Sequence, residues 1–330
     1  MKYTMKNIAC YTGCLLFFLL SSFNTITSQD SRQTGNNYAF DVEYGKNVNY
    51  QGDNEKLLMD IYWPKTGKKQ YPLVVLIHGG SFVGGDKKGF RPSLAQLADS
   101  GFVAVSINYR LGWNRPKVTD GCNADLSDLP NAVYRAFQDG HAALRFLVHH
   151  AAQYHIDPDW IFVGGASAGG IIALNLTYMD QKHADTEFAP QIKKFGKLNN
   201  ASNDLKDVYK IKGVCNMWGG LSDSTMITAS NAVPSILFHG TKDMVVPYDH
   251  GTWRSMCPDT FPVLYGSACI YRQLRTYHQP AILDLIINGK HGPVELSKEN
   301  IMSNTACFFH RVIRGNAHSG SYTGVHTGCM

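Results

Sequence analysis

Residues 165–169 read Gly-Ala-Ser-Ala-Gly, and the serine at their centre, Ser167, is a residue type that can act as a nucleophile. An apolar run, residues 160–164, precedes this turn, and a second apolar run, residues 170–174, follows it. A strand is therefore predicted to enter the turn and a helix to leave it. Glycine lets the backbone bend without a side-chain clash, and such a turn holds the serine hydroxyl clear of the backbone. Ser167 is thus a candidate nucleophile for acyl transfer.

A serine hydroxyl needs a base to accept its proton and a carboxylate to orient that base. Asp243 lies in the loop after the strand predicted at residues 234–238, and His291 follows the strand predicted at residues 281–287. The carboxyl ends of neighbouring parallel strands meet at one edge of a sheet, where ligands and chemistry collect. Asp243 and His291 are therefore predicted to serve Ser167 as acid and base.

Alternatives for both residues stay open in the sequence. Asp223 follows the preceding strand and is the rival carboxylate, and either aspartate could be a solvated loop residue. The chain has 13 histidines, and a single histidine is more often structural than catalytic. His239 lies too close to its strand to turn freely, and no strand-end position is predicted for His250, His278, His310 or His318.

Residues 78–82, His-Gly-Gly-Ser-Phe, end the buried strand predicted at residues 72–78. Glycines there let bare backbone N–H groups approach a substrate oxygen. The N–H groups of Gly80, Ser81 and Ala168 are predicted to bind the oxyanion of a tetrahedral intermediate, and the helix after the serine adds its dipole. On its own, His-Gly-Gly would also fit an ordinary turn at a strand end.

Strand and helix patterns alternate along the chain, which favours an α/β fold: a mostly parallel central sheet with helices on both faces. Residues 180–207 are polar and form either a small cap over the site or a plain surface excursion. We find no second hydrophobic core, so residues 38–330 are predicted to be a single domain. The predicted strands are residues 57–63, 72–78, 102–108, 208–217, 234–238 and 281–287, and the predicted helices are residues 91–100, 133–150 and 301–313.

The N-terminus has the pattern of a signal peptide. Lys2 and Lys6 give a positive start, and residues 14–20 form an apolar core that is too short to span a bilayer. Cleavage is expected near Ser28, followed by a disordered leader at residues 29–37. A lipid anchor would need a cysteine after the apolar core, and Cys14 does not lie after it, so a lipid anchor is disfavoured. The mature chain is expected to be secreted or periplasmic, with no membrane contact.

The chain has eight cysteines, and six remain after the signal peptide, an even number that suggests disulfides in an exported protein. Cys257 with Cys269 is the expected pair, because the segment between them resembles a surface loop. Cys215, in an apolar strand, fits a buried free thiol. No cysteine or histidine cluster has zinc spacing, so no metal or other cofactor is implied. The net charge of +5 without a dense basic cluster disfavours nucleic acid as a partner.

These motifs together resemble the α/β-hydrolase superfamily, from about residue 55 to residue 310. The sequence is most similar to the carboxylesterase and lipase-like branch with an HGGG-type oxyanion motif, which includes the hormone-sensitive-lipase-like esterases. Residues 240–247, Gly-Thr-Lys-Asp-Met-Val-Val-Pro, also resemble the acid loop of dienelactone-hydrolase-like and feruloyl-esterase-like enzymes. The resemblance implies a serine esterase with nucleophile Ser167, acid Asp243, base His291 and oxyanion donors Gly80, Ser81 and Ala168.

Two departures from the pattern bear on the substrate. Ser81 replaces the third glycine of HGGG, and Ala166 stands where hormone-sensitive-lipase relatives often have aspartate. These two departures favour secreted esterases that act on small to medium or aromatic acyl esters. The esters are either free or linked to a polysaccharide as feruloyl or acetyl groups. Phe82 and Trp218 are candidates for the substrate pocket, with core packing as the alternative. A polyester depolymerase, a peptidase and a non-catalytic binding protein on the same scaffold remain alternatives.

Overall fold

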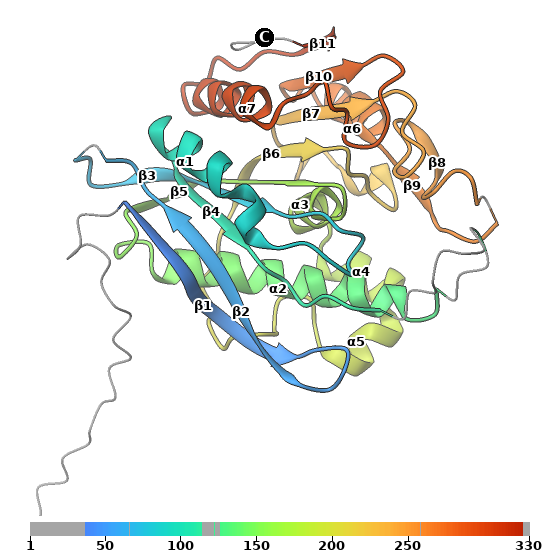
Figure 1. The fold of residues 1–330 in the computed structure, drawn as a ribbon, viewed down its shortest axis with the longest axis horizontal. Helices are drawn as coiled ribbons and strands as arrows, with labels where there is room; N and C mark the ends of the chain where they lie inside the picture. Colours follow the sequence, from blue (N-terminus) through green and yellow to red (C-terminus); the bar gives the residue numbers. More distant parts are fainter. Residues whose placement is uncertain (1–36, 66, 114–121, 123–125, 258, 326–330) are drawn as a thin grey trace, which may run out of the picture. The chain divides into compact units, whose positions relative to one another are not determined.

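A nine-stranded sheet is the central element of the part of the chain that the structure describes (Figure 1). The computed structural model describes residues 37–65, 67–113, 122, 126–257 and 259–325. The strands of the sheet are β1 (Tyr38–Val48), β2 (Asn54–Tyr62), β3 (Tyr71–Ile77), β4 (Val103–Ile107), β5 (Ile156–Ala166), β6 (Ile211–Met217), β7 (Ser235–Gly240), β10 (Ala281–Ile286) and β11 (Gly320–Thr323).

The strand order is β1-β2-β4-β3-β5-β6-β7-β10-β11. The pairs β1–β2 and β2–β4 are antiparallel, and every later pair from β4–β3 to β10–β11 is parallel. The mostly parallel sheet predicted from the sequence is therefore confirmed. A separate hairpin consists of β8 (His250–Thr252) and β9 (Val263–Tyr265).

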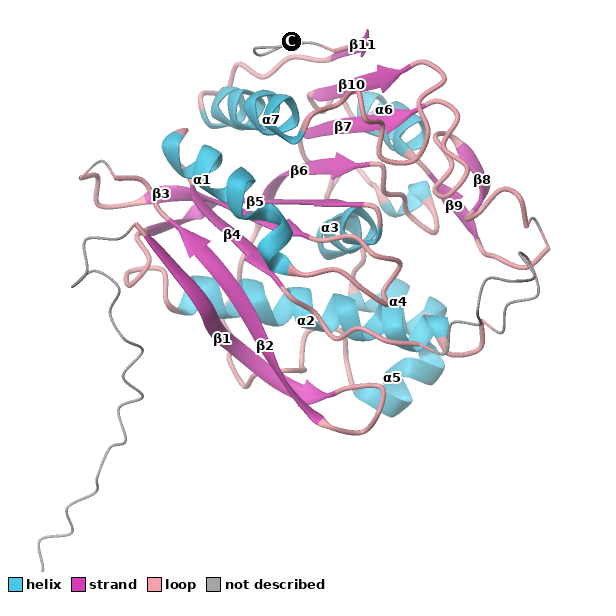
Figure 2. Cartoon of the chain, in the orientation of Figure 1, coloured by secondary structure: helices cyan, strands magenta, loops and turns pink. Residues whose placement is uncertain are grey.

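Helices cover both faces of the sheet (Figure 2). They are α1 (Arg91–Asp99), α2 (Leu129–His149), α3 (Ala168–Tyr178), α4 (Gln181–Glu187), α5 (Ala189–Phe195), α6 (Ser267–Thr276) and α7 (Lys298–Ile313), with short 3-10 turns at Lys87–Phe90 and Ser224–Met226. The helices α1 and α7 pack on the face that carries Phe162, whereas α2, α3 and α6 pack on the face that carries Val163. Because both faces are buried, these strands read as continuous apolar runs.

Several elements escaped the sequence analysis. The edge strand β1 is half exposed and has two register irregularities against β2, so it shows no clear alternation of apolar and polar residues. The helix α6, the β8–β9 hairpin and the edge strand β11 were also missed; β8, β9 and β11 are only three or four residues long. Among the described residues, no helix is long and apolar enough to cross a membrane.

The polar segment 180–207 contains α4 and α5 and lies mainly against α2. Phe188 packs its ring against Tyr134 and Phe137 of α2, and the carbonyl oxygen of Ala201 accepts a hydrogen bond from Arg145. The carbonyl oxygen of Ser202 accepts a hydrogen bond from the backbone of β1. These contacts place the segment against a helix and an edge strand, and Glu187 of α4 also accepts a hydrogen bond from Ser222 in the loop after β6.

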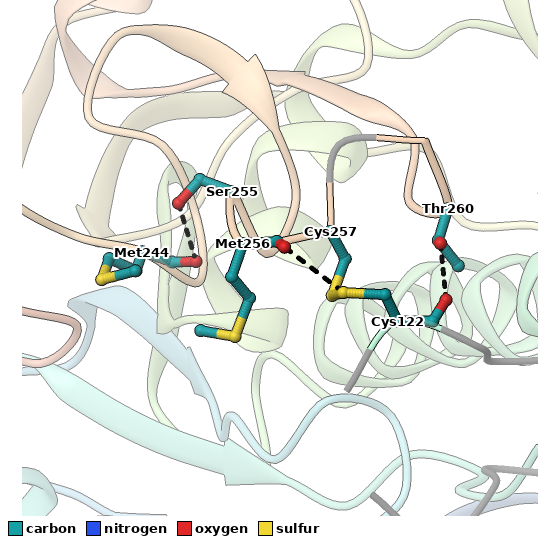
Figure 3. Close-up of a disulfide and its surroundings, with 6 residues drawn as sticks. All are labelled: Cys122, Met244, Ser255, Met256, Cys257 and Thr260. Atoms are coloured by element: carbon teal, nitrogen blue, oxygen red, sulfur yellow. Dashed lines mark hydrogen bonds between the residues drawn. A yellow bond between two sulfur atoms is a disulfide. The ribbon is translucent and has the colours of Figure 1, made fainter. Parts of the chain in front are cut away.

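The described disulfide joins Cys122 to Cys257 and corrects the expected Cys257–Cys269 pair (Figure 3). The Cα atoms of Cys122 and Cys257 lie 5.0 Å apart, within the range a disulfide requires. Cys269 is instead held in α6, where its thiol donates to a carboxylate oxygen of Asp249 at 2.8 Å. Cys215 is a buried free thiol, which confirms the expectation for it. Cys307 is disulfide-bonded.

The disulfide secures a segment that supports the Asp243 loop. The backbone N–H groups of Arg254 and Ser255 donate to the carbonyl oxygens of Val245 and Met244, just after Asp243. The hydroxyl of Ser255 also donates to the carbonyl oxygen of Met244 (Figure 3). Cys257 follows two residues later. The disulfide therefore anchors the turn at residues 253–256 on which the loop rests, although the two cysteines are 135 residues apart in the sequence.

Candidate active site

Ser167 occupies the sharp turn between β5 and α3. Its backbone has φ 55° and ψ −119°, a strained conformation for a residue with a side chain. A Cβ atom on Gly165 would overlap the carbonyl oxygen of Gly169, and one on Gly169 would overlap the carbonyl oxygen of Ile77 at the end of β3. Glycine is therefore required at both positions, because α3 starts in direct contact with the ends of β3 and β5.

Ser167, His291 and Asp243 form one chain of hydrogen bonds. The distance from Ser167 Oγ to His291 Nε2 is 2.8 Å, and the distance from His291 Nδ1 to Asp243 Oδ2 is 2.7 Å. The carboxylate accepts from Nδ1–H, which leaves Nε2 free to accept the serine proton. The structure thus brings together the three residues predicted as nucleophile, base and acid, from three different strand ends.

The second oxygen of Asp243 fixes the carboxylate in its loop. Asp243 Oδ1 accepts hydrogen bonds from the backbone N–H groups of Val245 at 2.8 Å and Val246 at 3.0 Å. Burial raises the pKa of Asp243, but hydrogen bonds from His239 and His291 outweigh this and lower the pKa to about 2. The rival Asp223 is exposed and accepts from the backbone N–H of Thr225, so the structure does not bring it to His291.

The lowered pKa of Asp243 predicts a contribution to stability that depends on pH. Because the folded pKa, about 2, lies below the ordinary value of 3.8, the ionised carboxylate stabilises the fold above about pH 4. That contribution, about 2 kcal/mol, is lost as the pH falls from about 4 towards 2. The free energy of unfolding measured with urea is expected to fall more steeply over this pH range for the wild type than for Asp243→Asn. Parallel stability curves for the two proteins would contradict the prediction.

The turn after β3 lies beside the nucleophile. A Cβ on Gly79 would be 2.7 Å from the carbonyl oxygen of Ala166 and 3.2 Å from Ser167 Cβ, so the backbone approaches the serine closely. Gly80 and Ser81 have φ of 120° and 53°. Among hydrogen bonds between described residues, none uses the backbone N–H of either. The N–H of Ala168 begins α3 and has no acceptor within that helix, so all three predicted donors are available.

The segment after β4 holds this turn in its strained form. The hydroxyl of Tyr109 donates to the carbonyl oxygen of His78 at 3.0 Å, and the indole N–H of Trp113 donates to that of Ser81 at 2.9 Å. The backbone N–H of Gly112 donates to the carbonyl oxygen of Phe82 at 2.8 Å. Three successive supports therefore fix the residues that the sequence predicted as the oxyanion turn.

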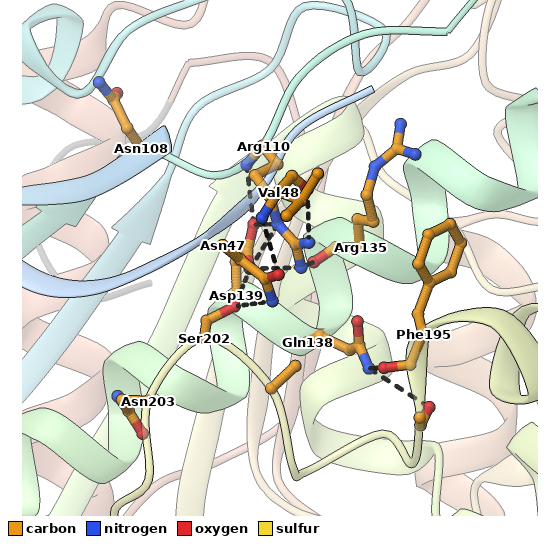
Figure 4. Close-up of polar contacts among 12 residues, drawn as sticks. Asn47, Val48, Asn108, Arg110, Arg135, Gln138, Asp139, Phe195, Ser202 and Asn203 are labelled. Atoms are coloured by element: carbon orange, nitrogen blue, oxygen red, sulfur yellow. Dashed lines mark hydrogen bonds and ion pairs between the residues drawn. The ribbon is translucent and has the colours of Figure 1, made fainter. Parts of the chain in front are cut away.

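A buried ion pair anchors that segment in turn (Figure 4). Arg110 contacts Asp139 of α2 at 2.8 Å, and both side chains are almost completely buried. Asp139 also accepts from the backbone N–H of Arg110 and from the hydroxyl of Ser202. Arg135, one turn earlier on α2, donates to the carbonyl oxygen of Gly112 at 2.6 Å. Removing one partner of such a pair would leave a buried charge uncompensated.

The two candidate pocket residues have different environments. Phe82 is completely buried and packs edge-on against Tyr109 and Trp253, so its side chain supports the turn and does not face an open pocket. This corrects the expectation for Phe82. Trp218 follows β6 with φ 46° and is partly exposed, and its indole lies beside Gly292, the residue that follows His291 in the sequence. An aromatic surface at this position agrees with a wall of the site.

Sequence reasoning missed His239. Its ring is completely buried and its Nε2 lies 3.4 Å from Asp243 Oδ2. The position of His239 in β7 disfavours it as a mobile base, and the same position holds its ring against the acid. The four-residue spacing from His239 to Asp243 across the turn at Gly240 was the available signal.

Comparisons with known proteins show the family to which the chain belongs. The profile of the BD-FAE family matches residues 59–230, more than half of the chain. A probable isoprenylcysteine alpha-carbonyl methylesterase from Arabidopsis thaliana is 25% identical over 264 residues, which are 72% of this chain and 50% of that protein. The chain thus spans half or less of the length of the first curated relatives that it matches.

Solved structures show the same fold. Esterase 2 of Thermogutta terrifontis, phosphorylated by paraoxon, superimposes with a TM-score of 0.56 at 18% identity, over 86% of this chain and 96% of that one. A bifunctional GH43-CE protein of Bacteroides eggerthii gives a TM-score of 0.57 at 20% identity, over 84% of this chain and 35% of that one. The α/β-hydrolase fold expected from the motifs is thereby confirmed. The chain belongs to the BD-FAE family of feruloyl-esterase-like α/β hydrolases.

Proposed function

We propose that the chain is a carboxylic ester hydrolase that works through an acyl-enzyme on Ser167. The observation that carries the proposal is the continuous hydrogen-bonded chain from Ser167 through both ring nitrogens of His291 to Asp243. The same constellation recurs on unrelated folds that transfer acyl groups. The family match, and relatives and structural neighbours whose names describe esterases, support it further.

In the proposed reaction, His291 Nε2 takes the proton of Ser167 as Oγ bonds to the ester carbonyl carbon. The carbonyl oxygen becomes an oxyanion and accepts hydrogen bonds from the N–H groups of Gly80, Ser81 and Ala168. Collapse breaks the bond to the alcohol oxygen, which receives the proton from His291, and leaves the acyl group on Ser167. Water then attacks the acyl carbon with the same proton transfers, releases the acid and restores the serine.

For the substrate, we propose small to medium or aromatic acyl esters, with feruloyl or acetyl groups on a polysaccharide as the second candidate. The family and the neighbour named as a bifunctional GH43-CE protein support the polysaccharide-linked class. Trp218, whose indole lies beside Gly292, supplies an aromatic surface for an acyl or sugar ring to contact. Enzymes that act on polyesters or peptides can use the same triad and differ in the substrate pocket.

Labelling with a fluorophosphonate, followed by mass spectrometry, tests the nucleophile directly. The expected result is one adduct, on the peptide that contains Ser167, with loss of ester hydrolysis in proportion to labelling. Hydrolysis of p-nitrophenyl, feruloyl and acetyl-xylan esters, polyester films and peptide amides on one panel then ranks the substrate classes. A folded protein that takes no adduct and hydrolyses no ester would favour a binding protein on a hydrolase scaffold and overturn the proposal.

We also propose that residues 1–28 are a signal peptide, that residues 29–37 are a leader and that the enzyme acts outside the cytoplasm. The Cys122–Cys257 disulfide supports this, since disulfides persist mainly in oxidising compartments. N-terminal sequencing of the protein recovered from the periplasm and the medium is expected to begin near residue 29. Recovery in the cytoplasm with Met1 intact would contradict export.

A further inference from the structure

A second histidine, His239, shares the catalytic aspartate with His291. Its Nε2 lies 3.4 Å from Asp243 Oδ2, the oxygen that accepts from His291, and 3.1 Å from the carbonyl oxygen of Val246. His239 stands near the end of β7 and has no exposed surface. Its ring nitrogens therefore depend on protein groups for their hydrogen bonds.

The other side of the His239 ring meets two further buried polar residues. Nδ1 lies 2.8 Å from the hydroxyl of Ser267, the first residue of α6. Ser267 Oγ in turn lies 3.1 Å from the side-chain nitrogen of Asn216 on β6. Neither residue has exposed surface, so Asn216, Ser267 and His239 form a line that ends on the catalytic acid.

Hydrogen-bond accounting assigns every proton along this line. Asn216 Oδ1 accepts from the backbone N–H of Gly219 at 3.0 Å, so its amide nitrogen faces Ser267 and donates to it. Ser267 Oγ then has its own proton to donate to His239 Nδ1. The carbonyl oxygen of Val246 can only accept, which places the imidazole proton on Nε2. Both ends of the line fit a His239 tautomer that carries its proton on Nε2.

We propose that His239, held in this tautomer by Ser267 and Asn216, is a positioning residue for Asp243 in the reaction under Proposed function. Its Nε2–H donates to the carbonyl oxygen of Val246, three residues further along the same loop, and Nε2 lies 3.4 Å from Oδ2 of Asp243. The donor thereby fixes the carboxylate relative to the loop that carries it. The inference rests on the proposed function, because positioning matters only if His291 acts as the base.

The second donor also determines where the proton stays. When His291 accepts the serine proton it becomes an imidazolium, and its Nδ1–H must remain on the nitrogen to be useful in the next step. A carboxylate with an additional donor is a weaker proton acceptor. The pKa of Asp243, which burial raises and the hydrogen bonds from His239 and His291 lower to about 2, agrees with this role.

The test compares two substitutions at His239. His239→Leu removes both ring nitrogens at similar volume, whereas His239→Gln keeps an N–H donor close to the position of Nε2. We expect kcat for p-nitrophenyl acetate to fall about 10- to 100-fold in His239→Leu, as for a small misplacement of a catalytic group, with KM within about twofold. His239→Gln is expected to recover at least about tenfold of that loss. A structural role alone would not separate kcat from KM or be rescued by one donor.

Ser267→Ala probes the line without touching Asp243. It removes the donor to His239 Nδ1, so kcat is expected to fall severalfold in the wild-type background. In the His239→Leu background the same substitution is expected to have no further effect, because its partner is gone. His310→Leu is the matched control: His310 bonds to the carbonyl oxygen of Ser100 between α7 and α1, and its loss is expected to leave kcat unchanged.

A readout that needs no turnover separates this inference from the proposed function. The low-field ¹H NMR signal of the proton between His291 Nδ1 and Asp243 is expected to shift or broaden in His239→Leu and to return in His239→Gln. If the wild type hydrolyses no ester, the proposed function fails, and an altered signal still supports the positioning. Equal kcat in His239→Leu and the wild type, or a loss of kcat that His239→Gln does not recover at equal thermal stability, overturns the inference. An unchanged NMR signal in His239→Leu also overturns it.

Discussion

Replacement of Ser167 by alanine is expected to lower kcat/KM for p-nitrophenyl acetate by about 10⁴- to 10⁶-fold, because the acyl-enzyme can no longer form. Ser167 Oγ lies 2.8 Å from His291 Nε2, and alanine lacks only this one atom, so the change removes the nucleophile and little packing. The alanine must adopt the same positive φ of 55°, yet serine already carries that strain. Steady-state kinetics measure the loss of activity, and thermal unfolding measures any change in stability.

The triad is expected to behave as a unit. Once Ser167 is alanine, a further His291→Ala substitution is expected to change kcat/KM by less than about threefold, since the base has no serine proton to accept. Any residual rate over water then reports the donors on Gly80, Ser81 and Ala168. Independent, additive losses from Ser167 and His291 would show that the two residues do not act on the same step, and full activity in Ser167→Ala would contradict the assignment.

The residues of the candidate triad could be predicted because each follows an apolar strand at a glycine-containing turn. In a parallel sheet such turns share one edge, so Ser167, Asp243 and His291 had to converge if the strands were correct. The glycines at 165 and 169 carry additional information, because their lack of a side chain is required by backbone contacts with β3 and the start of α3. The local sequence therefore indicates both where these strands end and how closely α3 approaches β3.

The supports around the site could not be predicted in the same way. Cys122 forms a disulfide with Cys257, 135 residues away in the sequence, and Trp113 donates a hydrogen bond to the carbonyl oxygen of Ser81. Such pairings depend on which strands are neighbours, and strand order is not contained in a periodicity. The burial of Phe82 could not be predicted for the same reason. Phe82 packs against Trp253, which lies between β8 and β9, and nothing in the sequence near Phe82 indicates this contact.

Gly169→Ala is expected to have the second largest effect, through both stability and activity. A Cβ atom there would overlap the carbonyl oxygen of Ile77 and crowd that of His78, so α3 must move away from the end of β3. Overpacking of a buried backbone contact costs about 3 kcal/mol, which thermal and urea unfolding would register. The same movement displaces Ser167 and the N–H of Ala168 relative to the oxyanion turn. A misplacement of about 1 Å costs about 100-fold in rate, so kcat/KM of the folded variant is expected to fall by that order.

The control for this prediction is another glycine whose Cβ would meet open space. Gly89 has no atom within 4 Å of a built Cβ, and Gly89→Ala is expected to change stability by less than about 0.5 kcal/mol and to leave kcat/KM unchanged. Fluorophosphonate titration counts the folded, reactive serines, so a loss of rate per titrated site separates displaced donors from unfolded protein. Wild-type rates per site in Gly169→Ala would mean that the elbow tolerates a side chain and that the contact between α3 and β3 does not set the position of the nucleophile.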